Sequence, residues 1–532
     1  MARAADGVHV PADSYLESFD PATGEMVGRV PRTPPEEVEA VAAEVAEAQR
    51  GWALVPLRER LGLIGRAADR LLDRREELSF LFTRESGKPL TESSIAEVGA
   101  AALVLSWVAR NGHHHLSPQR VADPQVIARY KRHWIVFDPL GVVGVIGPWN
   151  YPCLLPMADI AFALAAGDGV VFKPSELTPL SGRAIADVFS EVGLPEGVLR
   201  VVHGEGDTGA ALCGAGPVRR ILFTGSVEIG RKVLEETARR GKMVHLELGG
   251  NDPAVVCADA DLDRAARGVL WAACANAGQT CAAIERVYVD RRVHDAFVAR
   301  LVAVVKDLVP GDPRRPDTQI GPMITPSRHE WVLEHLEDAS RRGARVECGG
   351  PVEVPGLSGR FIAPAILTGV DHSMRVMREE TFGPLVPVMA FDTEQEAVRL
   401  ANDTEFGLGA SVWTRDVRRG RMLARRIEAG MVWINDHAYS NGLGEVPWGG
   451  VKASGSGVGH SRYGLQDMTV KRLIAEDPGR VPPGWWFPYG ETQRQGFLAV
   501  VESLARTRPA RRARAAWDGR GAIARYLRSL LR

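Results

Sequence analysis

Three stretches of the sequence carry side chains suited to the attack of a thiolate on a carbonyl carbon. Cys281 lies in NAGQTCAAIERVYV, before a segment that alternates like a strand. A cysteine reacts as its thiolate, which requires a base, a positive charge or a helix dipole nearby. Glu247 in HLELGGNDP ends a predicted strand and precedes two glycines, so its carboxylate can reach into a cleft as that base.

An oxyanion donor accompanies them. Asn150 in GPWNYP follows another predicted strand, at the edge where open α/β sheets bind ligands, and its amide N–H suits a developing oxyanion. A nucleophile, a base and an oxyanion donor together predict acyl transfer through a thioester.

The five other cysteines and the three adjacent histidines are not expected to be catalytic. The five other cysteines are interpreted as small buried hydrophobes: Cys153, Cys213, Cys257, Cys274 and Cys348. They show neither CxxC nor zinc-ligand spacing, which indicates a reducing compartment and predicts a cytoplasmic protein. Three adjacent histidines, His113–His115, point in different directions on a helix or strand, so we expect a surface position and no metal.

Length and composition indicate a folded protein of several domains. The chain has 532 residues, 45% hydrophobic and 25% charged, which suggests two to four domains. We find no uninterrupted apolar run of about 20 residues, so no transmembrane helix is predicted. The first residues lack the apolar core of a signal peptide.

Strands and helices alternate along the chain. Amphipathic helices are predicted over 35–50, 58–82 and 90–110. Buried strands are then predicted at 142–146, 169–172, 199–202 and 221–223, separated by helices at 155–166, 179–191, 207–214 and 226–239. This order predicts a parallel, doubly wound sheet with right-handed crossovers. A second α/β segment covers about 258–435, with strands at 283–289 and 385–391.

Two further features stand outside this alternation. Gly225 and Gly230 in FTGSVEIG mark a strand-to-helix junction of the kind that binds phosphate, although such a pair by itself more often only turns the chain. Residues 128–142 and 467–474 read as strands without a neighbour in sequence, and such strands can pair with another subunit.

The C-terminal segment differs from the rest in charge. Residues 506–532 carry nine arginines and one acid, whereas the whole chain has a net charge of −1. Apolar side chains interleave with the arginines, which is typical of a basic amphipathic helix at a membrane surface. Pro509 and the Gly519–Gly521 pair are expected to interrupt any long helix. A subunit-contact helix and a solvated tail remain alternatives.

Seven motifs, in order over roughly residues 15–475, resemble those of the NAD(P)-dependent aldehyde dehydrogenase superfamily. They are PWNYP, FKPSE, FTGS with Gly230, LELGGN, GQTC, EETFGP and PWGGVKASGSG. The resemblance implies an α/β fold with a Rossmann-type dinucleotide-binding domain, an α/β catalytic domain and a small β oligomerisation domain. The corresponding ranges are 1–127 with 143–247, 248–436, and 128–142 with 437–475, followed by a basic C-terminal extension, 476–532.

The resemblance also implies a role for each site residue. Cys281 would be the nucleophile, Asn150 and the Cys281 backbone N–H would hold the oxyanion, and Glu247 would activate water against the thioester. The residues implied to bind the cofactor are Trp149, Lys173, Glu176, Gly225, Ser226, Gly230, Glu380 and Phe382. A carboxylate at Glu176 can accept both hydroxyls of the adenosine ribose, which favours NAD, with NADP as the alternative because Lys173 can attract a 2′-phosphate.

Several alternatives for the function stay open. The chain is expected to oxidise an uncharged aliphatic or aromatic aldehyde and to self-associate as a dimer or tetramer, without a nucleic-acid partner. A CoA-acylating enzyme, a semialdehyde dehydrogenase, a cysteine hydrolase without redox chemistry, and an inactive relative with a membrane-associating tail are the other interpretations.

Overall fold

The computed structural model describes residues 14–122, 131–479, 485–487 and 489–530. The chain divides into two compact units. Unit 1 comprises residues 1–116 and 138–470, and unit 2 comprises residues 117–137 and 471–532. Each unit is described separately below.

The first sheet of unit 1 confirms the predicted doubly wound arrangement. Its strand order is β17-β9-β8-β5-β6-β7. The strands are β5 (Val142–Ile146), β6 (Gly169–Lys173), β7 (Leu199–Val201), β8 (Val218–Thr224), β9 (Met243–Glu247) and β17 (Gly455–Ser456). All pair in parallel except β17, which is antiparallel to β9. Every residue of β5 and β6 is buried, as expected for parallel strands covered on both faces.

Helices connect these strands at the predicted places. They are α6 (Leu154–Ala166), α7 (Pro179–Glu191), α8 (Gly206–Gly214) and α9 (Val227–Arg239). Because the strands are parallel, the ends of β5, β6, β8 and β9 meet at one edge of the sheet, and the segments that follow them form the site described below.

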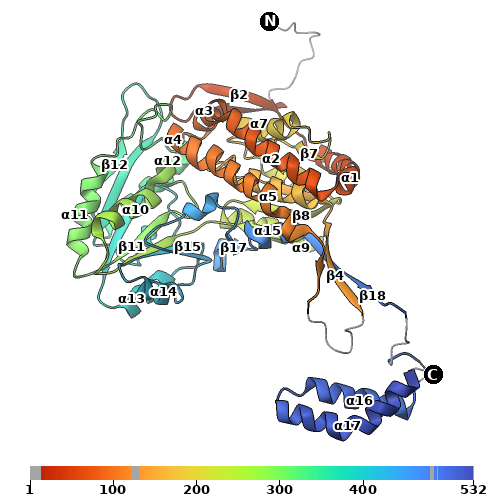
Figure 1. Cartoon of the computed structure of the whole chain (residues 1–532). Coiled ribbons are helices and arrows are strands. Elements are labelled where there is room, and N and C mark those ends of the chain that lie inside the picture. Colours follow the sequence, from red (N-terminus) through yellow and green to blue (C-terminus); the bar gives the residue numbers. More distant parts are fainter. Residues whose placement is uncertain (1–13, 123–130, 480–484, 488, 531–532) are drawn as a thin grey trace, which may run out of the picture. The chain divides into compact units, whose positions relative to one another are not determined.

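The N-terminal part of unit 1 begins with the strand pair β1 (Tyr15–Phe19) and β2 (Met26–Pro31) and continues as helices. These are η2 (Pro35–Glu37), α1 (Val38–Leu54), α2 (Leu57–Asp73), α3 (Arg75–Ser86), α4 (Leu90–Glu92), the π-helical turn η3 (Ser93–Gly99) and α5 (Ala100–Leu116) (Figure 1). The single helix predicted over 58–82 is two helices, because Arg74 adopts φ −95° and ψ 13° between them.

One helical segment of unit 1 is long and apolar. Among the described residues, Leu90–Leu116 has the length and composition to cross a membrane, whereas the sequence predicted an amphipathic helix over 90–110 and no transmembrane helix. Half of its most apolar window is buried inside unit 1, where α5 packs against α2 and α6. The core helix of a globular unit has these same properties.

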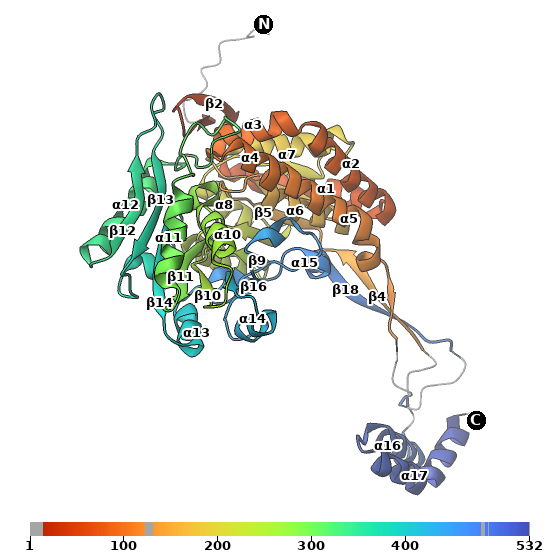
Figure 2. The same ribbon diagram turned by 60° about the vertical axis from the view of Figure 1, so that its left-hand side comes forward.

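The second sheet of unit 1 has strand order β12-β13-β14-β11-β10-β15-β16 (Figure 2). Its strands are β10 (Asp252–Val256), β11 (Ile284–Asp290), β12 (Arg345–Val352), β13 (Phe361–Thr368), β14 (Leu385–Phe391), β15 (Gly409–Trp413) and β16 (Met431–Ile434). Its helices are α10 (Leu262–Cys274), α11 (His294–Val305), α12 (Pro326–Arg341), α13 (Glu394–Asn402) and α14 (Val417–Ala424). The predicted second α/β segment and both of its predicted strands are confirmed.

Unit 1 also contains several short helical elements. They are η5 (Ala275–Gly278), η6 (Arg375–Met377), η7 (Tyr439–Gly442), η8 (Lys452–Ser454) and α15 (Ser461–Asp467). The range 437–475, predicted as bridging strands, is thus largely irregular and helical up to residue 467, and only β18 (Thr469–Glu476) forms a long strand there. The domain ranges themselves remain a prediction.

Unit 2 contains a small sheet and a helical hairpin. The sheet has the order β18-β4-β3, with β3 (Gln119–Arg120) and β4 (Arg132–Pro139). The two strands without a neighbour in sequence therefore pair within one chain, although residues 128–130 lie outside the described residues. Pairing of this sheet with another subunit stays a prediction.

The hairpin consists of α16 (Glu491–Ala505) and α17 (Pro509–Leu530). The expected interruption at Gly519–Gly521 is wrong, because α17 continues through both glycines, while Pro509 occupies its first position, where a missing N–H costs nothing. A Cβ at Gly519 would lie 2.8 Å from the Cβ of Ala499, and one at Gly496 would overlap Tyr526. These glycines thus allow the helices to approach closely.

Candidate active site

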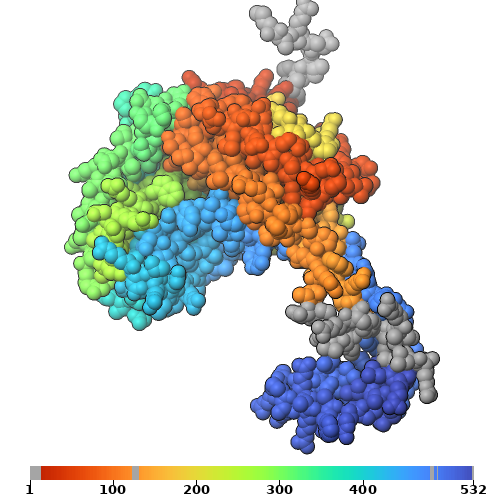
Figure 3. Space-filling model, viewed as in Figure 1, coloured from red at the N-terminus to blue at the C-terminus, as the bar shows by residue number. Residues whose placement is uncertain are grey.

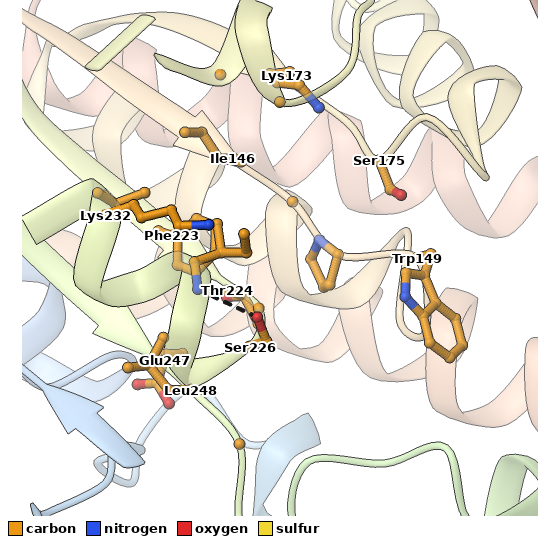
Figure 4. Close-up of a pocket in the computed structure, with 18 of the residues that line it drawn as sticks. Ile146, Trp149, Lys173, Ser175, Phe223, Thr224, Ser226, Lys232, Glu247 and Leu248 are labelled. Atoms are coloured by element: carbon orange, nitrogen blue, oxygen red, sulfur yellow. Dashed lines mark hydrogen bonds between the residues drawn. The ribbon is translucent and has the colours of Figure 1, made fainter. Parts of the chain in front are cut away.

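A cavity of about 600 Å³ opens at the strand ends of the first sheet and gathers nearly all of the predicted site residues. Asn150, Glu247 and Cys281 line it, together with the predicted cofactor-binding residues Trp149, Lys173, Glu176, Gly225, Ser226, Glu380 and Phe382. Figure 4 shows Lys173 and Ser175 on one side of this cavity and Glu247 on the other. Gly230 does not line it: a Cβ there would lie 2.5 Å from Leu248, so this glycine serves packing of α9.

A strained loop positions Cys281. Asn276 and Ala277 both have positive φ, 54° and 55°, which non-glycine residues adopt only when their surroundings impose it. The backbone N–H of Asn276 donates to Glu92 Oε2 at 2.7 Å. Its side-chain Nδ2 donates to the carbonyl oxygens of Asn150 and Gln279, at 3.2 and 3.1 Å. The loop before the nucleophile is therefore fixed by buried hydrogen bonds.

Asn150 is joined to the same loop. It is buried, and its Nδ2 donates to the carbonyl oxygen of Gln279 at 3.0 Å. A primary amide carries two N–H groups, so one remains for another acceptor. The amide that is predicted to hold an oxyanion is thus fixed by a residue two positions before Cys281.

The Cys281 thiol has a strongly acidic neighbourhood. Burial raises the pKa of this thiol, and the negative charges of Glu247, Glu380 and Asp252 raise it further. The thiol is therefore protonated at neutral pH, and a base or an added positive charge must generate the thiolate. Glu247, the base predicted from the sequence, lines the same cavity, and its charge acts on this thiol.

Glu247 ends β9 and is bonded to a residue that the sequence analysis missed. Its Oε1 lies 2.9 Å from Nε2 of His245, two residues earlier on the same strand. Burial lowers the pKa of His245, but the hydrogen bond and charge of Glu247, with the charge of Asp159, outweigh this and raise it overall. The Glu247 carboxylate is thus fixed by a hydrogen bond to His245, a residue that can change its charge.

The two sides of the cavity offer groups for a dinucleotide. Lys173 Nζ lies 3.7 Å from Glu176 Oε2, and burial lowers the pKa of Lys173. Ser226 caps α9 by accepting from the N–H of Ile229 at 3.3 Å (Figure 4). The positive end of this 13-residue helix lines the cavity, as in sites that bind phosphate.

Glu380 and Phe382, which also line the cavity, belong to one tightly held loop. Glu380 Oε1 accepts from the backbone N–H of Gly250 at 3.0 Å, and burial and the charge of Glu285 raise the pKa of Glu380 to about 8. Phe382 has φ 52°, and its ring lies edge-on to Trp149 with 5.5 Å between centroids.

Glu285 holds this loop, and the sequence analysis did not predict it. Its carboxylate accepts from the backbone N–H groups of Thr381 and Phe382, at 2.9 and 2.7 Å, and from Asn251 Nδ2 at 3.0 Å. A buried glutamate in a strand four residues after Cys281 is the only signal the sequence offered for it. Asn276 and Gln279 lie within the quoted Cys281 stretch, where their polarity was visible but their partners were not.

Other predicted features have simpler outcomes. All six cysteines are free; four of the five assigned to the core are buried, and Cys348 is half-buried. His113–His115 lie on α5, where His115 stacks on Trp107. No group of three metal-ligating side chains occurs among the described residues.

The arrangement is suited to covalent catalysis on a carbonyl compound beside a dinucleotide. A thiol, a carboxylate and an amide donor line one cavity, and its other lining residues can hold ribose and phosphate groups.

The aldehyde dehydrogenase family profile matches residues 9–474 of the chain. The chain is 38% identical over 463 residues to a glutarate-semialdehyde dehydrogenase of Pseudomonas putida, covering 86% of this chain and 94% of that protein.

Solved structures agree with this assignment. An aldehyde dehydrogenase of Brucella melitensis biovar abortus superimposes with a TM-score of 0.82 at 38% identity, over 87% of this chain and 94% of the other. An NAD-dependent aldehyde dehydrogenase of Sinorhizobium meliloti gives 0.85 at 36% identity, over 91% and 95%. The chain therefore belongs to the aldehyde dehydrogenase family of NAD(P)-dependent oxidoreductases.

Proposed function

We propose that the protein oxidises an aldehyde to the carboxylic acid through a thioester on Cys281, with Glu247 as the base that activates water. The observation that carries this proposal is the shared cavity that Cys281, Glu247 and Asn150 line. Glu247 takes the proton of the Cys281 thiol and passes it to solvent, and the Cys281 sulfur bonds to the aldehyde carbon as the carbonyl π bond breaks. An Asn150 N–H and the Cys281 backbone N–H stabilise the resulting negative oxygen. In the hydrolysis of the thioester, Glu247 takes a proton from a water molecule. The water oxygen bonds to the acyl carbon, and the bond between this carbon and the Cys281 sulfur breaks.

The lining residues fit NAD(P). When bound, the cofactor supplies the hydride acceptor for the oxidation step. Glu176, half-exposed beside Lys173, would hold the adenosine ribose, the start of α9 would hold the phosphates, and Glu380 would hold the nicotinamide ribose. Because Glu176 would repel a 2′-phosphate, NAD is the proposed cofactor and NADP the alternative.

The test is aldehyde-dependent NADH formation by the wild type and by Cys281→Ala. The wild type turns over and Cys281→Ala loses at least about a thousandfold in kcat, because the covalent step has no other nucleophile. Cys348→Ala, which changes a half-buried cysteine of β12, serves as the matched control and keeps full activity. Equal turnover in Cys281→Ala and wild type would contradict the proposal.

The same assay separates the alternatives. NADH formation that requires CoA would identify an acylating enzyme, an outcome disfavoured by the presence of Glu247 in the cavity. The proposed substrate is an uncharged aldehyde. Because a relative is named a glutarate-semialdehyde dehydrogenase, glutarate semialdehyde must be compared with pentanal, which has the same chain length without the carboxylate. A higher kcat/KM for glutarate semialdehyde than for pentanal would contradict the proposal that the substrate is uncharged.

We further propose that the helical hairpin of unit 2 docks on an anionic membrane surface. Residues 491–530 contain nine arginines and three acids. Gly496 and Tyr526 are its only buried residues among those described, so its other described apolar side chains are half-buried or exposed. Trp486, Phe487 and Trp517 are 60%, 81% and 67% exposed. The hairpin is shown in dark blue in Figure 3. Aromatic rings and arginines together are typical of membrane-surface segments.

Vesicle sedimentation tests this docking. The full chain should sediment with phosphatidylglycerol-containing vesicles but not with pure phosphatidylcholine, and the Arg511→Ser, Arg512→Ser and Arg514→Ser triple variant should lose binding. The matched control changes three exposed arginines of unit 1, Arg50, Arg239 and Arg345, to serine. Equal loss in both triple variants, or binding to RNA alone, would overturn the proposal.

Self-association as a dimer or tetramer is also proposed, on the basis of the family. The exposed strand β18 of unit 2 is the element on which we would expect subunits to pair. Sedimentation equilibrium measures the oligomeric state directly, and a monomer would contradict the proposal.

A further inference from the structure

His245 shares a strand face with the proposed base. The two residues are separated by one position on β9, so their side chains point to the same face of the sheet. The imidazole is 4% exposed and Glu247 is 15% exposed, with 2.9 Å between Nε2 and Oε1. This hydrogen bond occupies one carboxylate oxygen and leaves Oε2 for another partner.

Glycines of the C-terminal part of unit 1 enclose this pair. A Cβ on Gly457 would overlap the imidazole ring, and one on Gly459 would lie 3.4 Å from the ring and 3.8 Å from Glu247 Oε1. A Cβ on Gly449 would lie 3.5 Å from the same oxygen. The ring and the carboxylate are therefore seated in a space that admits them only in a narrow range of orientations.

Four titratable or charged groups face His245 from the elements packed around it. They are Glu247 on its own strand, Asp159 on α6, Arg220 on β8, and His460, which precedes α15. Arg220 is engaged by Asp467, since its Nη1 donates to the Asp467 carbonyl oxygen at 2.8 Å and its Nη2 to the carboxylate. Asp159 has no hydrogen-bond or ion-pair partner among the described residues.

Asp159 and His245 influence each other through charge. Burial raises the pKa of Asp159 to about 7, although the charge of His245 opposes this change. The charge of Asp159 in turn helps to raise the pKa of His245. The imidazole is hydrogen-bonded to the Glu247 carboxylate at 2.9 Å, so a change in its charge acts directly on that carboxylate.

We propose that His245 is a positioning residue for Glu247 and that, together with Asp159, it sets the pH range in which Glu247 accepts a proton from water. This inference rests on the proposed hydrolytic role of Glu247. The imidazole N–H fixes Oε1, so Oε2 receives the proton while the water oxygen bonds to the acyl carbon and the Cys281 sulfur leaves. A protonated imidazole weakens Glu247 as a base, and a neutral imidazole leaves it stronger, so thioester hydrolysis rises with pH through the titration of His245.

The experiment separates oxidation from hydrolysis in His245 variants of the full enzyme. Stopped-flow NADH formation reports the first turnover, and steady-state NADH formation reports hydrolysis when that step is slow. His245→Leu keeps the NADH burst, but its steady-state rate falls about 10- to 100-fold, because Glu247 loses its orientation. His245→Gln retains an N–H donor, so it recovers most of the rate while losing the acidic limb of the pH profile.

Asp159→Asn tests the second group without removing the His245–Glu247 hydrogen bond. Loss of the negative charge lowers the pKa of His245, so the acidic limb of hydrolysis moves to lower pH by about one unit. His294→Gln is the matched control, because this histidine bonds to Asp295 at the start of α11, and its pH profile stays that of the wild type.

The outcomes distinguish this inference from the proposed function. Unchanged hydrolysis in Glu247→Gln would reject the hydrolytic role of Glu247 itself. If Glu247→Gln loses hydrolysis but His245→Gln and Asp159→Asn keep the wild-type pH profile, the role proposed for His245 and Asp159 is wrong. The hydrolytic role of Glu247 would then still stand. The His245 variants could lose the burst because they fail to fold. In that case the pH profile of Asp159→Asn tests the inference: an acidic limb at lower pH supports it, and an unchanged profile contradicts it.

Discussion

The cavity of unit 1 and the hairpin of unit 2 use charged residues in opposite ways. Around Cys281, Glu285 is buried and Glu92 is half-buried, and both carboxylates accept backbone N–H groups. In the hairpin, arginines are exposed, and pairs such as Arg494 with Glu491 are more than half exposed on both sides. Buried, fully bonded groups fix geometry, whereas exposed pairs contribute about 0–1 kcal/mol to stability and mainly set surface charge.

This difference predicts where substitutions affect chemistry. Changes in the cavity should alter kcat or cofactor affinity, and changes in the hairpin should leave both untouched. The following experiments test the contrast, beginning with the largest expected effect on activity.

Asn150→Ala should lower kcat by about 10²- to 10³-fold, because it removes an oxyanion donor. Steady-state NADH formation at saturating aldehyde measures the loss. Asn111→Ala is the matched control, since that amide bonds only to the Trp107 carbonyl of its own helix, and it should stay within about twofold of wild type. A loss below tenfold for Asn150→Ala would exclude it as the main donor.

Glu285→Ala should destabilise the protein and weaken NAD binding. The change leaves the buried N–H groups of Thr381 and Phe382 without their acceptor, at a cost of about 1–3 kcal/mol each. Chemical denaturation measures the free energy of unfolding, and calorimetry measures the Kd for NAD. Wild-type affinity in a destabilised variant would show that the loop does not need Glu285 for its shape.

Glu380 should make NAD binding depend on pH. Its pKa is raised to about 8, so the carboxyl is protonated below that pH and becomes a carboxylate above it. A carboxylate accepts both ribose hydroxyls, whereas a protonated carboxyl must use one oxygen as a donor. The Kd for NAD should therefore fall as pH rises through about 8, and Glu380→Gln should show a flat profile over this range.

Gly496→Val should have the smallest effect on activity. A side chain at this position collides with Tyr526, so the hairpin should open and become sensitive to protease. The kcat should stay within about twofold of wild type, because the residues that line the cavity belong to unit 1. A large loss of kcat would break the proposed separation between the two regions. Gly521→Val is the matched control, since only the end of Arg525 lies near that position.

Much of the fold followed from local pattern. Buried apolar runs such as 142–146 and 385–391 became strands with the predicted bounds, because a strand covered on both faces needs an uninterrupted apolar run. The helix expected over 58–82 was harder to predict, since its break at Arg74 depends on one residue's dihedral angles. In α17, Gly519 argues against a helix locally but is tolerated because Ala499 of α16 packs against it.

The sequence by itself determined which residues are proposed to carry the chemistry: Cys281, Glu247 and Asn150 lie in short motifs whose residue types limit what they can do. Only the tertiary structure decided which groups hold them. Glu285 reaches the loop of Phe382 across nearly a hundred positions, and the charge of Asp159 acts on His245 from a different element. Such partners are chosen by distance in the folded chain, and a single sequence records the residue types but not those distances.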